Sequence, residues 1–265
     1  MTNDDGLHTP GIWVLAEAVS RSGAISVVAP DREQSGVGVG ITLQHPVKVS
    51  EAISRIEGVT TLSVEGTPAD SVLLALQGLT PKPVDLVVSG INEGANLGMN
   101  VLVSGTVGAA FQAHFFGVPA IALSVAARMT DTVPKVRQPS NFQAAGRFGQ
   151  VIAQLFRDKI LSGPMLLNVN FPNLPLAEIE GVKVTRLAKG RYVDTLEKLP
   201  TDRHTYYWIG KGRPEWDAEP GTDVWAIRNK FISITPLHMN LTHDVSTPLL
   251  EGFSGDIFRE LKGAG

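Results

Sequence analysis

Cysteine is absent from the sequence, and its absence excludes two kinds of site. No disulfide framework can hold the fold together, and no thiolate is available to bind zinc or an iron–sulfur cluster. A chain without cysteine suits a reducing compartment, so we expect a cytoplasmic protein.

Long apolar runs and clusters of basic residues are also missing. The most apolar run, residues 118–127, is about half the length needed to span a bilayer. The N-terminus has no basic region followed by an apolar core, so we expect no signal peptide. Lys and Arg are scattered in a chain of net charge −3, which gives no electrostatic footprint for nucleic acid. We therefore expect neither a membrane nor a nucleic-acid polymer as partner.

The pattern of apolar residues predicts an α/β fold. The 265 residues, 43% of them apolar, can bury a substantial core in one large domain or two. Apolar residues at positions 12, 15, 16 and 19 have helical spacing, and a β-rich run follows at 25–29. A loop, a helix and a strand in this order are typical of a βαβ unit and hence of a parallel sheet. Further expected strands lie at residues 41–49 (a hairpin arm or edge strand), 61–64, 85–89, 119–124, 165–170, 182–187 and 232–235. Further expected helices follow residues 66–70 and Ser104 and cover residues 141–159.

The character of the chain changes after residue 177. We expect residues 1–177 to form one domain. Residues 178–265 carry short expected strands around a polar stretch with scattered aromatic residues, from Lys189 to Asp223. This stretch has too few apolar residues for a core of its own, so we expect it to pack on something else, such as a second subunit.

Polar loops at residues 3–6, 31–38, 67–70 and 90–98 each follow an expected strand, although only two residues precede the first loop. In an open parallel sheet, ligands bind outside the carboxyl ends of the strands. Adjacent carboxylates repel, and a cation between them relieves the repulsion. Two carboxylates (Asp4, Asp5), a hydroxyl (Ser35) and an amide oxygen (Asn92) would form an all-oxygen site suited to catalytic Mg²⁺ or Mn²⁺. Turn formation alone also explains Asn, Asp, Ser and Gly in such loops.

A helix that opens with Ser104, Gly105 and Thr106 presents free N–H groups and the positive end of its dipole, which favours an anion. Ser104 as a plain helix cap accounts for the same position without a ligand. A metal ion beside an anion site indicates phosphoryl chemistry.

Seven sequence words carry a family resemblance, and they fall in one order along nearly the whole chain. They are Thr2-Asn3-Asp4-Asp5-Gly6, residues 28–36, Gly66-Thr67-Pro68-Ala69-Asp70, residues 88–92 with Gly94-Ala95-Asn96, Ser104-Gly105-Thr106-Val107, residues 167–172 and residues 233–237. In these words the chain resembles the SurE family of metal-dependent 5′-nucleotidases, some of which also act on 3′-nucleotides or short polyphosphate.

The resemblance implies a Rossmann-like, doubly wound, mostly parallel sheet with a smaller β-rich C-terminal part that is exchanged between subunits of a homodimer or homotetramer. It implies one Mg²⁺ or Mn²⁺ per subunit, with ligands Asp4, Asp5, Ser35 and Asn92. Phosphate contacts are implied for Asn96, Ser104, Gly105 and Thr106, and a part in catalysis for Asp4, Asp5, Asn92, Ser104 and His238. The chain departs from the family pattern in its short first strand and in Gly38-Val39-Gly40, where relatives commonly read Gly-His-Ser.

We therefore expect a phosphatase that acts on nucleoside monophosphates, with Asp4 or Asp5 as candidate base and His238 as candidate acid. A nucleotide or phosphate sensor without catalysis is the alternative on the same scaffold. An aspartyl-phosphate receiver would need an Asp paired with a Lys, and the sequence offers no such pairing.

Overall fold

The computed structural model describes residues 1–127, 139–200 and 204–263. Its largest sheet has the order β4-β5-β6-β10-β7, in which β4, β5 and β6 run parallel and β10 runs antiparallel to β6. β7 lies at the edge, parallel to β10. The bounds of these strands are β4 Val87–Glu93, β5 Ala120–Val125, β6 Leu166–Phe171, β7 Gly181–Val184 and β10 Phe231–Pro236.

A second sheet has the order β1-β3-β2, with β1 (Ser26–Pro30) parallel to β3 (Thr60–Val64) and β2 (Val49–Glu51) antiparallel to it. Met1 and Thr2 join the two sheets. The amide of Thr2 donates to Val88 O at 3.1 Å, and Val28 N donates to Met1 O at 2.9 Å. The first strand is therefore reduced to a single bridging pair. The expected strand at residues 41–49 is wrong over most of its length, because within it only Val49 belongs to a strand, β2.

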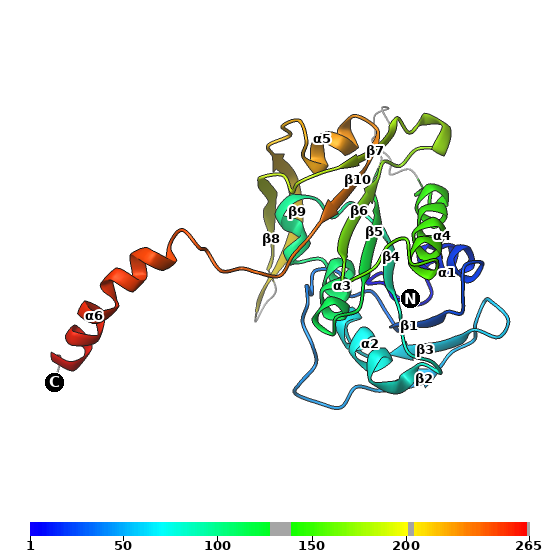
Figure 1. Cartoon of the computed structure of the whole chain (residues 1–265), viewed down its shortest axis with the longest axis horizontal. Helices are drawn as coiled ribbons and strands as arrows, with labels where there is room; N and C mark the ends of the chain where they lie inside the picture. Colours follow the sequence, from blue (N-terminus) through cyan, green and yellow to red (C-terminus); the bar gives the residue numbers. More distant parts are fainter. Residues whose placement is uncertain (128–138, 201–203, 264–265) are drawn as a thin grey trace.

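Helices cover both faces of the sheet, so the doubly wound α/β architecture is confirmed (Figure 1). α1 (Pro10–Ser20) and α4 (Gln143–Arg157) pack on one face, where Leu15 and Ile152 share a core cluster with Ile121. α2 (Pro68–Leu74) and α3 (Gly105–Phe115) pack on the other face. Shorter helical turns are the π-helical turn Ala75–Leu79 and the 3-10 turns Gly98–Leu102 and Leu176–Glu178.

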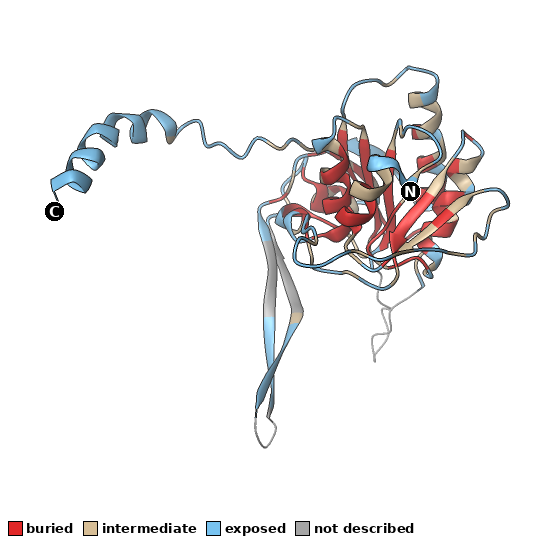
Figure 2. Ribbon diagram, turned by 90° about the horizontal axis from the view of Figure 1, so that it is seen from below, coloured by how far each residue is buried: buried red, intermediate tan, exposed pale blue. Residues whose placement is uncertain are grey.

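The C-terminal third contributes to the main sheet and also projects from it. β7, β10 and α5 (Asp223–Arg228) lie against the body, whereas the hairpin of β8 (Gly190–Pro200) and β9 (Thr205–Trp216) and the helix α6 (Thr247–Gly263) extend away (Figures 1 and 2). The stretch expected to lack a core is therefore largely this hairpin. The expected domain boundary at residue 177 stays a prediction. Among the described residues, no helix is both long and apolar enough to cross a membrane.

Candidate active site

The turn at residues 3–6 presents Asp4 and Asp5 at the carboxyl end of the parallel strands. Asn3 holds the turn, because its Nδ2 donates to Gly6 O at 3.0 Å and to Thr9 Oγ1 at 3.1 Å. Gly6 has a φ of +96° and packs against the backbone of Arg32, where a β carbon would lie only 2.9 Å from Arg32 C. Only glycine fits this position, so the Asn-Asp-Asp-Gly pattern dictates the local shape.

Asp4 is buried and touches two of the other candidate elements. Gln34 N, in the loop after β1, donates to Asp4 O at 2.7 Å. At the start of α3, a β carbon on Gly105 would lie 2.8 Å from Asp4 Cβ and 3.1 Å from Gln34 O. The hydroxyl of Thr106 donates to Asp4 Oδ1. The first polar loop, the second polar loop and the helix start therefore meet at Asp4.

Asp5 reaches the end of β4. Its Oδ2 accepts a hydrogen bond from Glu93 N at 3.1 Å. The expected loop at residues 90–98 is partly wrong, because β4 continues through Asn92 to Glu93 with an irregular register after Ser89. Asn92 Nδ2 donates to Gly94 O at 2.6 Å, which leaves the amide oxygen as the atom that can serve a cation.

The pKa of the Asp5 carboxyl is raised by its surroundings in the site. Burial and the neighbouring charge of Asp4 raise the pKa of the Asp5 carboxyl to about 7, with smaller contributions from Glu93 and Glu33. The hydrogen bond from Glu93 N works in the opposite direction. Two carboxylates that disfavour each other's ionisation form a site that a cation would relieve.

The two serines differ in their surroundings. Ser104 is buried and caps α3, because its Oγ accepts from Val107 N at 3.1 Å. Ser35 is exposed, and its Oγ donates to Glu33 Oε1 at 2.8 Å. A hydroxyl that donates one hydrogen bond keeps its lone pairs, so Ser35 remains able to ligate a cation.

Asn96 is anchored in a buried amide cluster. Its backbone N donates to Asn170 Oδ1 at 2.8 Å, and its Nδ2 donates to Ser124 Oγ at 2.9 Å. Its carbonyl accepts from the side chains of Asn168 and Asn170. In this conformation both nitrogens of Asn96 have protein partners, so its phosphate contact stays a prediction. Asn168 and Asn170 were not singled out as functional positions, although alternate asparagines on a buried strand signal such a cluster.

His238 is the expected site residue that the fold does not bring together with the others. It follows β10, which runs antiparallel to β6, and its neighbour Leu237 donates through N to Leu166 O at 2.8 Å. Leu166 begins β6, a strand of six residues, whereas Asn170 at its far end meets Asn96. Six residues span roughly 16 Å at the usual rise of a strand. Within one chain His238 therefore lies at the opposite edge of the sheet from Asp4 and Asp5, and its part in catalysis stays a prediction.

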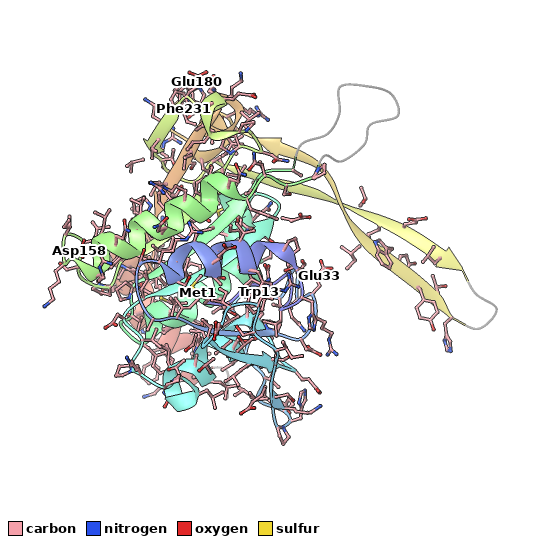
Figure 3. The ribbon with its side chains drawn as sticks, turned by 90° about the vertical axis from the view of Figure 1, so that its right-hand side faces the viewer. Met1, Trp13, Glu33, Asp158, Glu180 and Phe231 are labelled. Atoms are coloured by element: carbon pink, nitrogen blue, oxygen red, sulfur yellow. The ribbon has the colours of Figure 1, made fainter. Side chains whose placement is uncertain are left out.

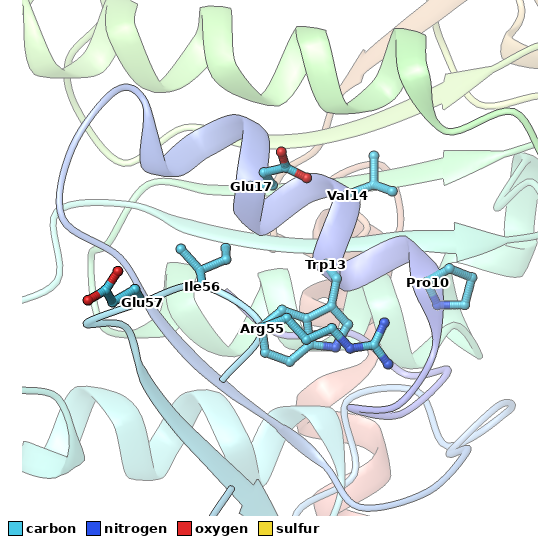
Figure 4. Close-up of a pocket in the computed structure, with 7 residues that line it drawn as sticks. All are labelled: Pro10, Trp13, Val14, Glu17, Arg55, Ile56 and Glu57. Carbon is cyan, nitrogen blue, oxygen red and sulfur yellow. The ribbon is translucent and has the colours of Figure 1, made fainter. Parts of the chain in front are cut away.

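Glu33, after β1, and Asp158, after α4, lie on opposite sides of the body in Figure 3. Two hollows lie outside the site. A hollow of about 530 Å³ borders α1, and in it the Arg55 guanidinium lies 5.3 Å from the Trp13 ring centroid (Figure 4). A larger one of about 730 Å³ lies between β1 and β4, below Thr2. None of the candidate ligands lines either hollow.

The donor set fits a hard divalent cation. Within residues 1–127, 139–200 and 204–263, no three His, Asp or Glu side chains cluster as a metal site. A cation at this edge would need the hydroxyl and amide oxygens of Ser35 and Asn92 beside the carboxylates of Asp4 and Asp5. Such a mixed oxygen set is one that Mg²⁺ and Mn²⁺ accept, with positions left for water or substrate.

Fold and site together define a doubly wound α/β protein whose polar edge places two carboxylates beside the start of a helix. The chain belongs to the SurE family, since the family model described as Survival protein SurE matches residues 1–194.

Relatives and a solved structure extend the match over nearly the whole chain. A protein named 5′-nucleotidase SurE from Geobacter sulfurreducens is 41% identical over 96% of this chain and 92% of its own length. The protein of that name from Xanthomonas axonopodis pv. citri is 41% identical over 99% of this chain and 98% of its own. The crystal structure of SurE protein from Aquifex aeolicus superimposes with a TM-score of 0.76 at 37% identity, covering 96% of this chain and 98% of that one.

Proposed function

We propose that this protein hydrolyses nucleoside 5′-monophosphates to nucleoside and phosphate with the help of one Mg²⁺ or Mn²⁺ per chain. The coarser part of this statement, a phosphoric monoester hydrolase of the nucleotidase class, follows from the family and from the names of relatives at 40–41% identity. The finer parts are the cation, the 5′ position and the residues.

One observation carries the finer proposal. The Asp4-Asp5 turn is in contact with the loop that holds Ser35, with the strand end that holds Asn92 and with the start of α3. Ser35 is next to Gln34, and Asn92 is next to Glu93, whose backbone amides make these contacts. Four oxygen donors and a helix start therefore belong to one edge of the sheet.

Asp4, Asp5, Ser35 and Asn92 would hold the cation. When bound, such an ion neutralises charge on phosphoryl oxygens and lowers the pKa of a water molecule. The N–H groups at the start of α3, an eleven-residue helix capped by Ser104, would hold phosphate oxygens through hydrogen bonds and the helix dipole. Asp4 or Asp5 would accept the proton of the attacking water. The role of His238 as the acid for the leaving oxygen stays a prediction.

The test is phosphate release from 5′- and 3′-mononucleotides and short polyphosphate, each with Mg²⁺, Mn²⁺ or EDTA. We expect metal-dependent release from 5′-monophosphates that is lost in Asp5→Asn. Asp158→Asn is the matched control, because this exposed carboxylate pairs with Arg157 on the side of the body opposite to Glu33. Saturable nucleotide binding without phosphate release by the folded protein would favour the sensor instead.

We also propose a homodimer or homotetramer as the working assembly. α6 leaves the body of its own chain, and all of its described side chains are exposed (Figure 2). Its exposed apolar residues are Leu249, Leu250, Phe253, Ile257, Phe258 and Leu261. An uncovered apolar patch of this kind favours a protein partner. Light scattering should show a dimer or tetramer that dissociates when residues 247–265 are removed, and a monomeric intact chain would contradict the proposal. The cytoplasmic location stays a prediction.

A further inference from the structure

Thr106 is fully buried, and its hydroxyl is directed at a carboxylate. It is the second residue of α3, and its Oγ1 donates to Asp4 Oδ1 across 102 positions of sequence. Thr106 lies in the first turn of the helix, so its hydroxyl has no preceding helical turn to bond. Here it bonds an acidic side chain that belongs to the candidate cation site.

The surroundings of Asp4 leave its carboxylate little freedom to move. Its backbone is fixed by Gln34 N at 2.7 Å. Gly105 leaves room for the side chain, since a β carbon there would lie 3.1 Å from Asp4 Oδ2. The backbone and one side of the carboxylate are thus confined, and the hydrogen bond from Thr106 holds Oδ1.

We propose that Thr106 is a positioning residue, whose hydroxyl orients the Asp4 carboxylate toward the divalent cation instead of contacting the phosphate through its side chain. This inference rests on the proposed function. Partners that hydrogen-bond a metal ligand typically change metal affinity about 10- to 100-fold when they are removed. The hydroxyl of Thr106 has the donor that an ionised carboxylate, an acceptor only, requires.

The test measures Mn²⁺ binding without nucleotide, by the electron paramagnetic resonance signal of free Mn²⁺. We compare the intact protein with Thr106→Val, which removes the hydroxyl at nearly constant volume, and with Thr106→Ser, which keeps it. Thr185→Val is the matched control, because this buried hydroxyl bonds Ser233 and Thr235 in the sheet and has no contact with Asp4. Thermal melting in EDTA checks that each variant is folded.

We expect the Mn²⁺ dissociation constant to rise about 10- to 100-fold in Thr106→Val, and to stay near the starting value in Thr106→Ser and Thr185→Val. If Thr106→Val does not fold, Thr106→Cys takes its place, since a thiol of similar size donates only weakly. An unchanged Mn²⁺ affinity in the folded variant would overturn the inference, even if the variant melted at a lower temperature or had a raised KM for the nucleotide. Failure of the intact protein to bind Mn²⁺ would overturn the proposed function together with the inference.

Discussion

Replacing Gly105 with alanine is the perturbation that most sharply separates the site from the fold. The added β carbon would lie 2.8 Å from Asp4 Cβ and 3.1 Å from Gln34 O. Neither atom is the far end of a flexible side chain, so the start of α3 or the Asp4 turn must move. Overpacking of this kind costs about 1–3 kcal/mol. Replacing glycine by alanine within a helix returns up to about 1 kcal/mol.

The net loss of stability is therefore small, roughly 0–2 kcal/mol, which lowers the Tm of a chain of this size by less than about 8 °C. The expected loss of activity is larger. A displacement of about 1 Å in a positioned group can cost about 100-fold in rate. We expect kcat/KM for AMP to fall about 100-fold in Gly105→Ala, while the protein stays folded.

Two variants serve as controls for this prediction. In Gly23→Ala nothing lies within 4 Å of the new β carbon, so activity should be unchanged. In Gly108→Ala the β carbon would lie 2.0 Å from Gly38 O, so the damage falls on the loop that follows β1 and should lower stability more than Gly105→Ala does. A folded Gly105→Ala protein with the starting kcat/KM would refute the close placement of α3 and the Asp4 turn.

Three further outcomes are expected. In EDTA the pKa of Asp5 is about 7 in the folded protein against 3.8 in the unfolded chain. Because the unfolded chain releases this proton at lower pH, the free energy of unfolding should fall as pH rises from about 4 to 7. Urea titrations of Asp5→Asn should lack this slope, and an equal slope in the variant would contradict the burial of the carboxyl. Mn²⁺ at 100 times its dissociation constant should stabilise the protein by about 2.7 kcal/mol. This stabilisation should raise the Tm of the intact protein by several degrees and should be lost in Asp5→Asn. An equal rise in Tm for the intact protein and the variant would show that the ion binds elsewhere. Asp223→Ala should lower the free energy of unfolding by about 3 kcal/mol or more. The backbone amides of Gly98, Ala188 and Val224 would lose the buried carboxylate that accepts their hydrogen bonds. An unchanged urea midpoint would show that water takes the place of the carboxylate.

Local patterns allowed much of the site to be predicted. The Asn-Asp-Asp-Gly turn and the Ser104 cap depend on neighbouring residues alone, and the structure places both as expected. The alternation of strands and helices likewise predicts a parallel sheet, whose carboxyl ends share one edge.

Features that depend on register across the sheet were missed. The continuation of β4 through Asn92 follows from its pairing with Ser124, and neither strand carries a local sign of it. The position of His238 follows from β10 running antiparallel to β6, a direction that periodicity does not encode. The bond between Thr106 and Asp4 joins segments 102 residues apart, so only the folded chain reveals it.

The most direct measurement of the central claim is to follow Mn²⁺ occupancy and phosphate release from AMP in one titration, on the intact chain and on Asp5→Asn. If the edge formed by Asp4, Asp5, Ser35 and Asn92 holds the catalytic ion, occupancy and rate should rise together and saturate at about one ion per chain, as expected for a single cation bound through a few carboxylates. The variant should show neither. Full turnover in EDTA, or equal Mn²⁺ binding by Asp5→Asn, would contradict the claim.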